Sequence, residues 1–130
     1  MVRLLLNTNR ENMNNLHDFV DSIIENGGAT FNLALGTSPT SGYVVSIKGG
    51  SHTPIDETRQ SIEQTINQFV AEKGLELSVD ENFLGAWVDD GWLYLDISRV
   101  YDEKKKAMLV GIQNNQKAIF NLNDGSTIHL

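Results

Sequence analysis

The sequence predicts a single α+β domain over residues 1–130, with a mainly antiparallel or mixed sheet of about six or seven strands and three helices. Three observations predict this class. The chain has the length of one domain. Apolar residues recur at helical spacing in separate segments, and short alternating segments lie between them. Turn residues divide those alternating segments into hairpins, so the expected order is β-α-β-β-α-β-β-α-β-(β).

The N-terminal part predicts a strand, a turn and a helix. Val2–Asn7 is short and apolar and predicts a strand, and the polar segment Asn7–Asn12 predicts a turn. Apolar residues then follow one face of a helix: Leu16, Phe19, Val20, Ile23 and Ile24. Gly27 and Gly28 end this helix, because glycine accepts the left-handed conformation at a helix C-terminus.

A hairpin is expected next. Thr30–Leu35 alternates, which places Phe31, Leu33 and Leu35 on one face, and Tyr43–Ile47 is β-branched and aromatic like a returning strand. The segment between them is rich in glycine, serine and proline and predicts a turn. The glycine-rich segment from Gly49 to Pro54 is expected to break the chain again.

The second half begins with the clearest helix, Asp56–Lys73, whose apolar stripe is Ile62, Ile66, Phe69 and Val70. Leu75–Asn82 is expected to be irregular, with a short strand at Glu76–Val79. The remaining predicted elements are strands at Phe83–Val88 and Trp92–Val100, a helix at 103–115, a strand at Ala118–Leu122 and a returning strand at Thr127–Leu130.

The hairpin around Asp90-Gly91 carries the most unusual residues of the chain. This dipeptide favours a two-residue primed turn, which sets Trp87 opposite Tyr94 and Asp89 opposite Trp92. One face is then plain core, whereas the other combines aromatic rings with acids. Tryptophan and tyrosine are enriched at interface hot spots, so this face predicts a platform for a partner protein, a second protomer or a cationic ligand. The alternative is that helices or loops of the same chain cover it. The predicted contact residues are Trp87, Asp89, Asp90, Trp92, Tyr94 and Asp96.

A second candidate site is a glycine-rich loop before a helix, where backbone N–H groups can hold an anion. This predicts a small-molecule or nucleotide-binding module, such as a nucleotide sponge, with contacts from Gly49, Gly50, Ser51, His52 and Thr53. No phosphate-loop pattern supports it, and glycine pairs are also ordinary connections. A third hypothesis, a hydrolase that uses paired aspartates or His52, has no motif, because the three histidines are scattered.

Composition excludes several classes of protein. There is no cysteine, which excludes thiol catalysis and disulfides, and no zinc-ligand spacing occurs. The net charge is −7, and residues 76–103 hold eight acids against Arg99 alone. General nucleic-acid binding is therefore not expected, since that requires a large basic surface. No apolar run is long enough to span a membrane. We expect a cytoplasmic protein with no catalytic activity, metal or cofactor.

Three stretches carry a resemblance: Ser41–Ser46, Gly85–Ser98 and Asn114–Leu122, read as SGYVVS, GAWVDDGWLYLDIS and NNQKAIFNL. In them the chain resembles a group of small uncharacterised proteins carried by phages, prophages and other mobile elements. The resemblance implies a mobile-element origin and no particular chemistry. Small acidic phage proteins often act by binding a host protein, defence nucleases included.

The sequence therefore predicts a non-catalytic binding protein that modulates or inhibits a host protein, such as a defence nuclease of the CRISPR or restriction type. Its partner would carry a basic surface that complements the acidic block. An exposed aromatic sheet face can also pair with itself, so a homodimer is a further expectation.

Overall fold

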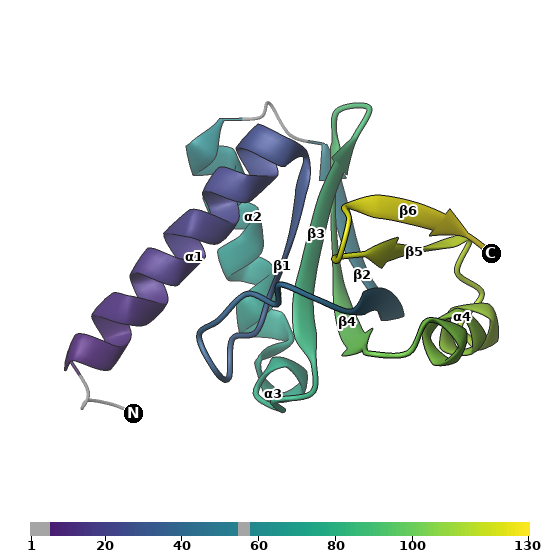
Figure 1. The fold of residues 1–130 in the computed structure, drawn as a ribbon. Coiled ribbons are helices and arrows are strands. Elements are labelled where there is room, and N and C mark those ends of the chain that lie inside the picture. The colour runs from purple at the N-terminus through teal and green to yellow at the C-terminus, as the bar shows by residue number, and fades with distance from the viewer. Residues whose placement is uncertain (1–5, 55–57) are drawn as a thin grey trace.

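The computed structural model describes residues 6–54 and 58–130 and confirms the predicted α+β class (Figure 1). Its six strands form one antiparallel sheet in the order β1-β3-β4-β2-β5-β6. The strands are β1 (Gly28–Phe31), β2 (Tyr43–Pro54), β3 (Phe83–Asp89), β4 (Trp92–Tyr101), β5 (Ala118–Asn121) and β6 (Ser126–His129). The helices are α1 (Leu6–Asn26), α2 (Arg59–Glu72), α3 (Gly74–Leu77) and α4 (Lys104–Gln113).

The sheet has a helical side and a side that is only partly covered. Helices α1, α2 and α3 lie on one side, whereas α4 and the β5–β6 hairpin lie toward the other (Figure 1). The main core fills the space between the first group of helices and the sheet, with buried residues that include Phe19, Ile23, Ile66, Leu93 and Leu95. A smaller cluster lies under α4 and is built on Val45, Ala107 and Ile119. Neither cluster covers one end of the partly covered side of the sheet.

Two predicted elements are confirmed closely. Helix α2 buries Ile62, Ile66 and Phe69, as its apolar spacing predicts, and Thr58 caps it by accepting a hydrogen bond from the Ser61 N–H. Its predicted start at Asp56 lies outside the described residues. The β3–β4 hairpin has the predicted register along its whole length. Its turn has positive φ at both Asp90 and Gly91, which matches the right-handed twist of the strands.

The prediction for the N-terminal segment is wrong in the part that the structure describes. Leu6 and Asn7 are helical rather than extended, and the predicted turn at Asn7–Asn12 is also helical. Residues 2–5 of the predicted strand lie outside the described residues. Leu6 and Met13 are seven residues apart, in helical phase with Leu16, so the apolar spacing outweighs the low helix propensity of the asparagines.

The predicted hairpin between Thr30–Leu35 and Tyr43–Ile47 is also wrong. Strand β1 ends at Phe31 and pairs with β3, so Leu35 lies in a turn and 62% of it is exposed. Asn32 makes this turn: its side-chain oxygen accepts from the Leu35 N–H, and its amide donates to the Asp80 carbonyl at 2.7 Å. A buried asparagine that satisfies backbone groups on two segments ends the strand early.

The expected break at Gly49–Pro54 is absent. Strand β2 runs through it to Pro54, with irregularities between Ser46 and Lys48 and between Gly49 and Ser51. A Cβ atom at Gly50 would overlap the Leu95 carbonyl oxygen and the Phe69 ring, so the second irregularity requires glycine there. The glycines thus let one long strand bend around the core.

The rest of the chain follows the prediction with one exception. A short helix, α3, replaces the strand expected at Glu76–Val79, and Lys48 of β2 binds Glu76 on it at 2.6 Å. Helix α4 and strands β5 and β6 agree with the predicted elements to within two residues at each end. The fourth helix is therefore the difference from the predicted count of three.

Candidate functional site

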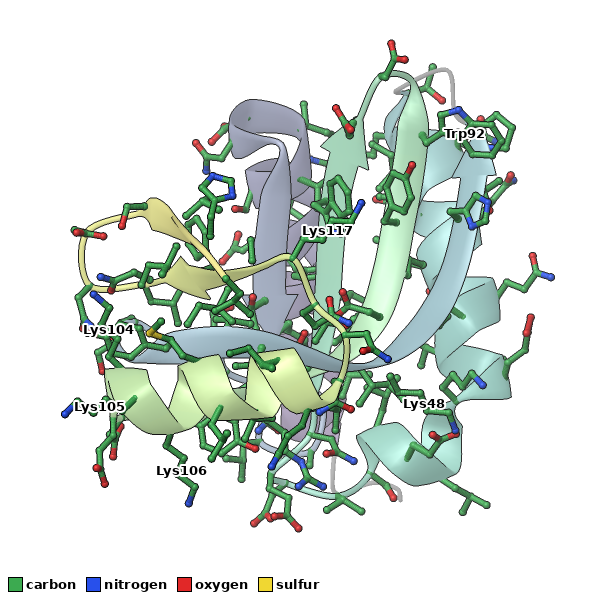
Figure 2. All side chains as sticks on the ribbon, turned by 90° about the vertical axis from the view of Figure 1, so that its right-hand side faces the viewer. Lys48, Trp92, Lys104, Lys105, Lys106 and Lys117 are labelled. Carbon is green, nitrogen blue, oxygen red and sulfur yellow. The ribbon has the colours of Figure 1, made fainter. Side chains whose placement is uncertain are left out.

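Four aromatic side chains from three adjacent strands form a row on the partly covered side of the sheet. Trp87 and Tyr94 stack with centroids 4.1 Å apart and planes at 10°. His52 follows at 5.7 Å from Tyr94, and Trp92 at 5.2 Å from His52. We call Trp87, Tyr94, His52 and Trp92 the ring row. Figure 2 looks onto this side of the sheet and shows Trp92 near its upper edge.

The ring row exists because of strand register. Trp87 of β3, Tyr94 of β4 and His52 of β2 are direct cross-strand partners, so their side chains project side by side. The sequence predicts the Trp87–Tyr94 pair but treats His52 as a loop residue. Reading residues 43–54 as one strand with bulges would have placed His52 in the row.

The ring row is open to solvent. Trp87 is 44% exposed and Trp92 is 38% exposed, whereas Tyr94, which has a ring on each side, is half-buried. Within the described residues, the chain leaves both tryptophans partly exposed, which favours the platform over a face that the chain covers itself. Two exposed tryptophans in one row of rings are unusual on a solvent-facing sheet and mark a contact surface.

A half-buried carboxylate lies beside the ring row. Asp96 of β4 pairs with Gly85 of β3, and a Cβ at Gly85 would overlap the Asp96 carboxylate. The Ser98 hydroxyl donates to Asp96 Oδ1 at 2.6 Å, and the Ser46 hydroxyl donates as well. Burial raises the pKa of Asp96 above its ordinary value, and the two hydroxyls oppose that rise. Among the described residues, no ion pair to Asp96 is formed.

A cleft of about 240 Å³ joins the ring row to Asp96. Three rings line it together with backbone and polar groups of β2 and β4. Gln116, from the connection between α4 and β5, lines it as well. The full set is Ser46, Gly49, Gly50, His52, Trp87, Tyr94, Leu95, Asp96 and Gln116. Neither Ser46 nor Gln116 is predicted as a site residue from the sequence, since only the tertiary structure brings their segments to the cleft.

The two sites predicted from sequence therefore meet in one place. Of the glycine-rich set, Gly49, Gly50 and His52 line the cleft. Ser51 and Thr53 pair in the ladder with Leu95 and Leu93, which belong to the core. The segment is a strand and not a loop before a helix, so the backbone arrangement expected for phosphate binding is not formed.

The hairpin acids lie next to the ring row. Asp89 is the direct partner of Trp92, and Asp90 occupies the turn; both are exposed. They make no ion pair among the residues that the structure describes. With Asp96, they give this end of the sheet a negative character. Asp89 ends β3 and Asp90 forms the turn, so these two acids also stabilise the hairpin.

Lysines are found farther along the same view. Figure 2 shows Lys104, Lys105 and Lys106 around the start of α4, away from Trp92. Lys48 is engaged with Glu76, and Lys106 lies 5.5 Å from the centre of the Tyr101 ring. Lys117 follows Gln116 on the connection to β5 and is exposed. Lys104, Lys105 and Lys106 therefore lie around the start of α4, whereas Figure 2 shows Lys117 over the middle of the sheet, between α4 and Trp92.

Within the described part of the chain there is neither a metal-binding cluster nor a helix that could span a membrane. No group of three or more histidine, cysteine, aspartate or glutamate side chains has the arrangement of a metal site there. None of the helices described has both the length and the apolar character needed to cross a bilayer.

Comparison of the chain with protein-family models, with curated proteins and with solved structures finds no match.

Proposed function

We propose that this protein acts by binding another protein through the ring row and the acids around it, without catalysing a reaction. The observation that carries the proposal is the open ring row: two tryptophans, a tyrosine and a histidine aligned on a face that the helices leave free. Large rigid rings provide contact area at a small entropic cost, which is why they dominate interface energies. The acids beside them favour a partner with a basic surface.

The resemblance to mobile-element proteins supplies the biological setting of this proposal. We propose that the partner is a host protein, with a defence nuclease as the leading class, and that binding modulates or inhibits it. The acidic block contributes association rate and salt dependence, whereas the rings contribute affinity.

The experiment is affinity capture from a native-host lysate treated with nuclease, using matched variants. Trp87→Ala removes the more exposed tryptophan of the row, and Phe120→Ala removes a comparably exposed ring on β5 outside it. We expect a stoichiometric partner that the wild type and Phe120→Ala retain and that Trp87→Ala loses. Replacing Asp89 and Asp90 with lysine should weaken capture and reduce its salt dependence. A partner retained equally by all variants would contradict this surface.

A small-molecule module is the second candidate function, favoured by one observation: the cleft combines rings with a half-buried carboxylate. Its volume lies just below the usual range of ligand pockets, about 300–1,000 Å³. A thermal-shift screen with nucleotides and small amines tests it, since a ligand at 100 times its Kd stabilises a protein by about 2.7 kcal/mol. Absence of any shift, together with face-dependent capture of a protein, would favour the first proposal.

A further inference from the structure

The Asp96 carboxylate lacks a counter-charge. It is half-buried at the cleft, two hydroxyls donate to it, and no described cation pairs with it. A carboxylate has room for about four hydrogen bonds, so two acceptor positions remain after Ser98 and Ser46. Removing an unpaired charge from water is costly, and a bound cation would offset that cost. Among the described residues, no cation therefore donates to Asp96 in the cleft.

The rings define what shape that donor can have. Trp87, Tyr94 and His52 stack along the row, so both faces of Tyr94 are occupied and its edge is presented to the cleft. The outer face of Trp87 points toward β1, where its partner is Gly28, which has no side chain. No residue of β1 lines the cleft, so Trp87 and Tyr94 present ring edges there, and charge recognition depends on Asp96. Guanidinium is a planar cation of proteins that fits between ring edges and pairs with a carboxylate through two parallel hydrogen bonds.

From these contacts we propose that the cleft is a receptor for an arginine side chain of the partner, with Asp96 accepting from the guanidinium and Trp87 forming one wall. This proposal rests on the proposed function and names the group of the partner that is recognised. A volume of about 240 Å³ fits one side-chain end and lies below the usual range of sites that hold a whole small ligand, about 300–1,000 Å³. Gln116 on the opposite wall offers a further polar contact.

The chain provides its own reporter for the test. Its two tryptophans, Trp87 and Trp92, both belong to the ring row, so intrinsic fluorescence and the two indole N–H resonances report on this site alone. The probe is L-argininamide, and the matched control is L-citrullinamide, which has nearly the same shape without the charge. We expect saturable shifts of the Trp87 indole signal and binding about tenfold tighter for argininamide than for citrullinamide.

Two pairs of variants locate the charge recognition. Asp96→Asn should weaken argininamide binding by about tenfold, whereas Asp89→Asn, which removes the same charge from an exposed position on the same hairpin, should weaken it by less than about threefold. Gln116→Lys adds a cation to the opposite wall without altering the sheet, and should also weaken binding by about tenfold. The amide spectrum of each variant establishes that the fold is retained.

Each alternative outcome overturns a stated part. Equal binding of argininamide and citrullinamide, or equal losses for Asp96→Asn and Asp89→Asn, would overturn the receptor. A second result would also overturn the receptor: no binding of argininamide, together with tighter binding of adenosine monophosphate by Gln116→Lys. That result would assign the cleft to an anion. Spermidine binding tighter than argininamide would identify a free amine as the ligand. If argininamide fails while Trp87→Ala still abolishes capture of a protein, this inference fails and the proposed function stands. If argininamide binds and capture is independent of Trp87, the cleft is a guanidinium site, but the proposed function of this face fails together with the assignment of the arginine to a protein partner.

Discussion

The Trp87 and Tyr94 rings lie face to face, 4.1 Å between centroids and 10° between planes, as direct partners across β3 and β4. Such a pair stabilises a hairpin, yet it leaves 44% of Trp87 exposed. The stack therefore holds a large apolar surface rigid in water without covering it. A rigid exposed ring loses little conformational entropy when a partner binds, which is the property that a binding surface needs.

The stack should be measurable as a coupling between the two rings. A double-mutant cycle with Trp87→Leu and Tyr94→Leu should give a coupling in the free energy of unfolding of about 0.5–1.5 kcal/mol. Urea denaturation provides the four stabilities. A cycle that joins Trp87 to Phe120 on β5 serves as the control and should give a coupling near zero. A zero coupling for the first pair would mean that the rings do not stack in solution.

Asp96 should make stability depend on pH in a particular direction. Because burial raises its pKa above the ordinary 3.8, the folded protein holds this proton to a higher pH than the unfolded chain does. Its contribution is fully present below pH 3.8 and is lost as the pH rises through the raised pKa. The wild type should therefore lose stability relative to Asp96→Asn across that interval, and Asp96→Asn should be at least as stable at pH 7.

Urea denaturation of both proteins at a series of pH values measures this difference. All other ionisable groups are shared, so their contributions cancel on subtraction. A difference that stays constant over the acidic range, or one of opposite slope, would show that Asp96 is not desolvated in the folded protein.

The two adjacent glycines of β2 should respond differently to alanine. Gly50→Ala places a Cβ against the Leu95 carbonyl and the Phe69 ring, and should cost about 1–3 kcal/mol. Gly49→Ala meets nothing within 4 Å and should change stability by less than about 0.5 kcal/mol. Chemical denaturation of the two variants tests whether β2 bulges between Gly49 and Ser51. Equal costs at the two positions would contradict it and restore the loop predicted from sequence.

An exposed leucine in the turn after β1 and a core leucine of β4 together test the β1 boundary. Leu35→Ser should cost less than about 0.5 kcal/mol, because Leu35 is exposed in the turn after β1. Leu93→Ala, in the core of the same sheet, should cost about 2–5 kcal/mol. A large cost at Leu35 would mean that the strand continues to Leu35 with that side chain inside, as its alternation predicts.

The elements predicted correctly are those that local sequence patterns determine. Helix α2 follows from the spacing of Ile62, Ile66 and Phe69, and the β3–β4 hairpin follows from Asp90-Gly91 and the alternation beside it. A two-residue turn determines register along both strands, so the pairing of Trp87 with Tyr94 is contained in the sequence. The predicted aromatic and acidic face is therefore correct in composition.

Only the tertiary structure decided the contacts between segments that are distant in sequence. Strand β1 pairs with β3 rather than with its neighbour in sequence, since Asn32 ends it and binds the Asp80 carbonyl. The glycines at positions 49 and 50 resemble a loop locally, but packing against Phe69 and pairing with β4 keep them in a strand. That continuation carries His52 to the ring row. Alternation and turn residues act over a few positions, whereas a site assembled from β2, β3, β4 and the segment before β5 depends on which surfaces the core brings together.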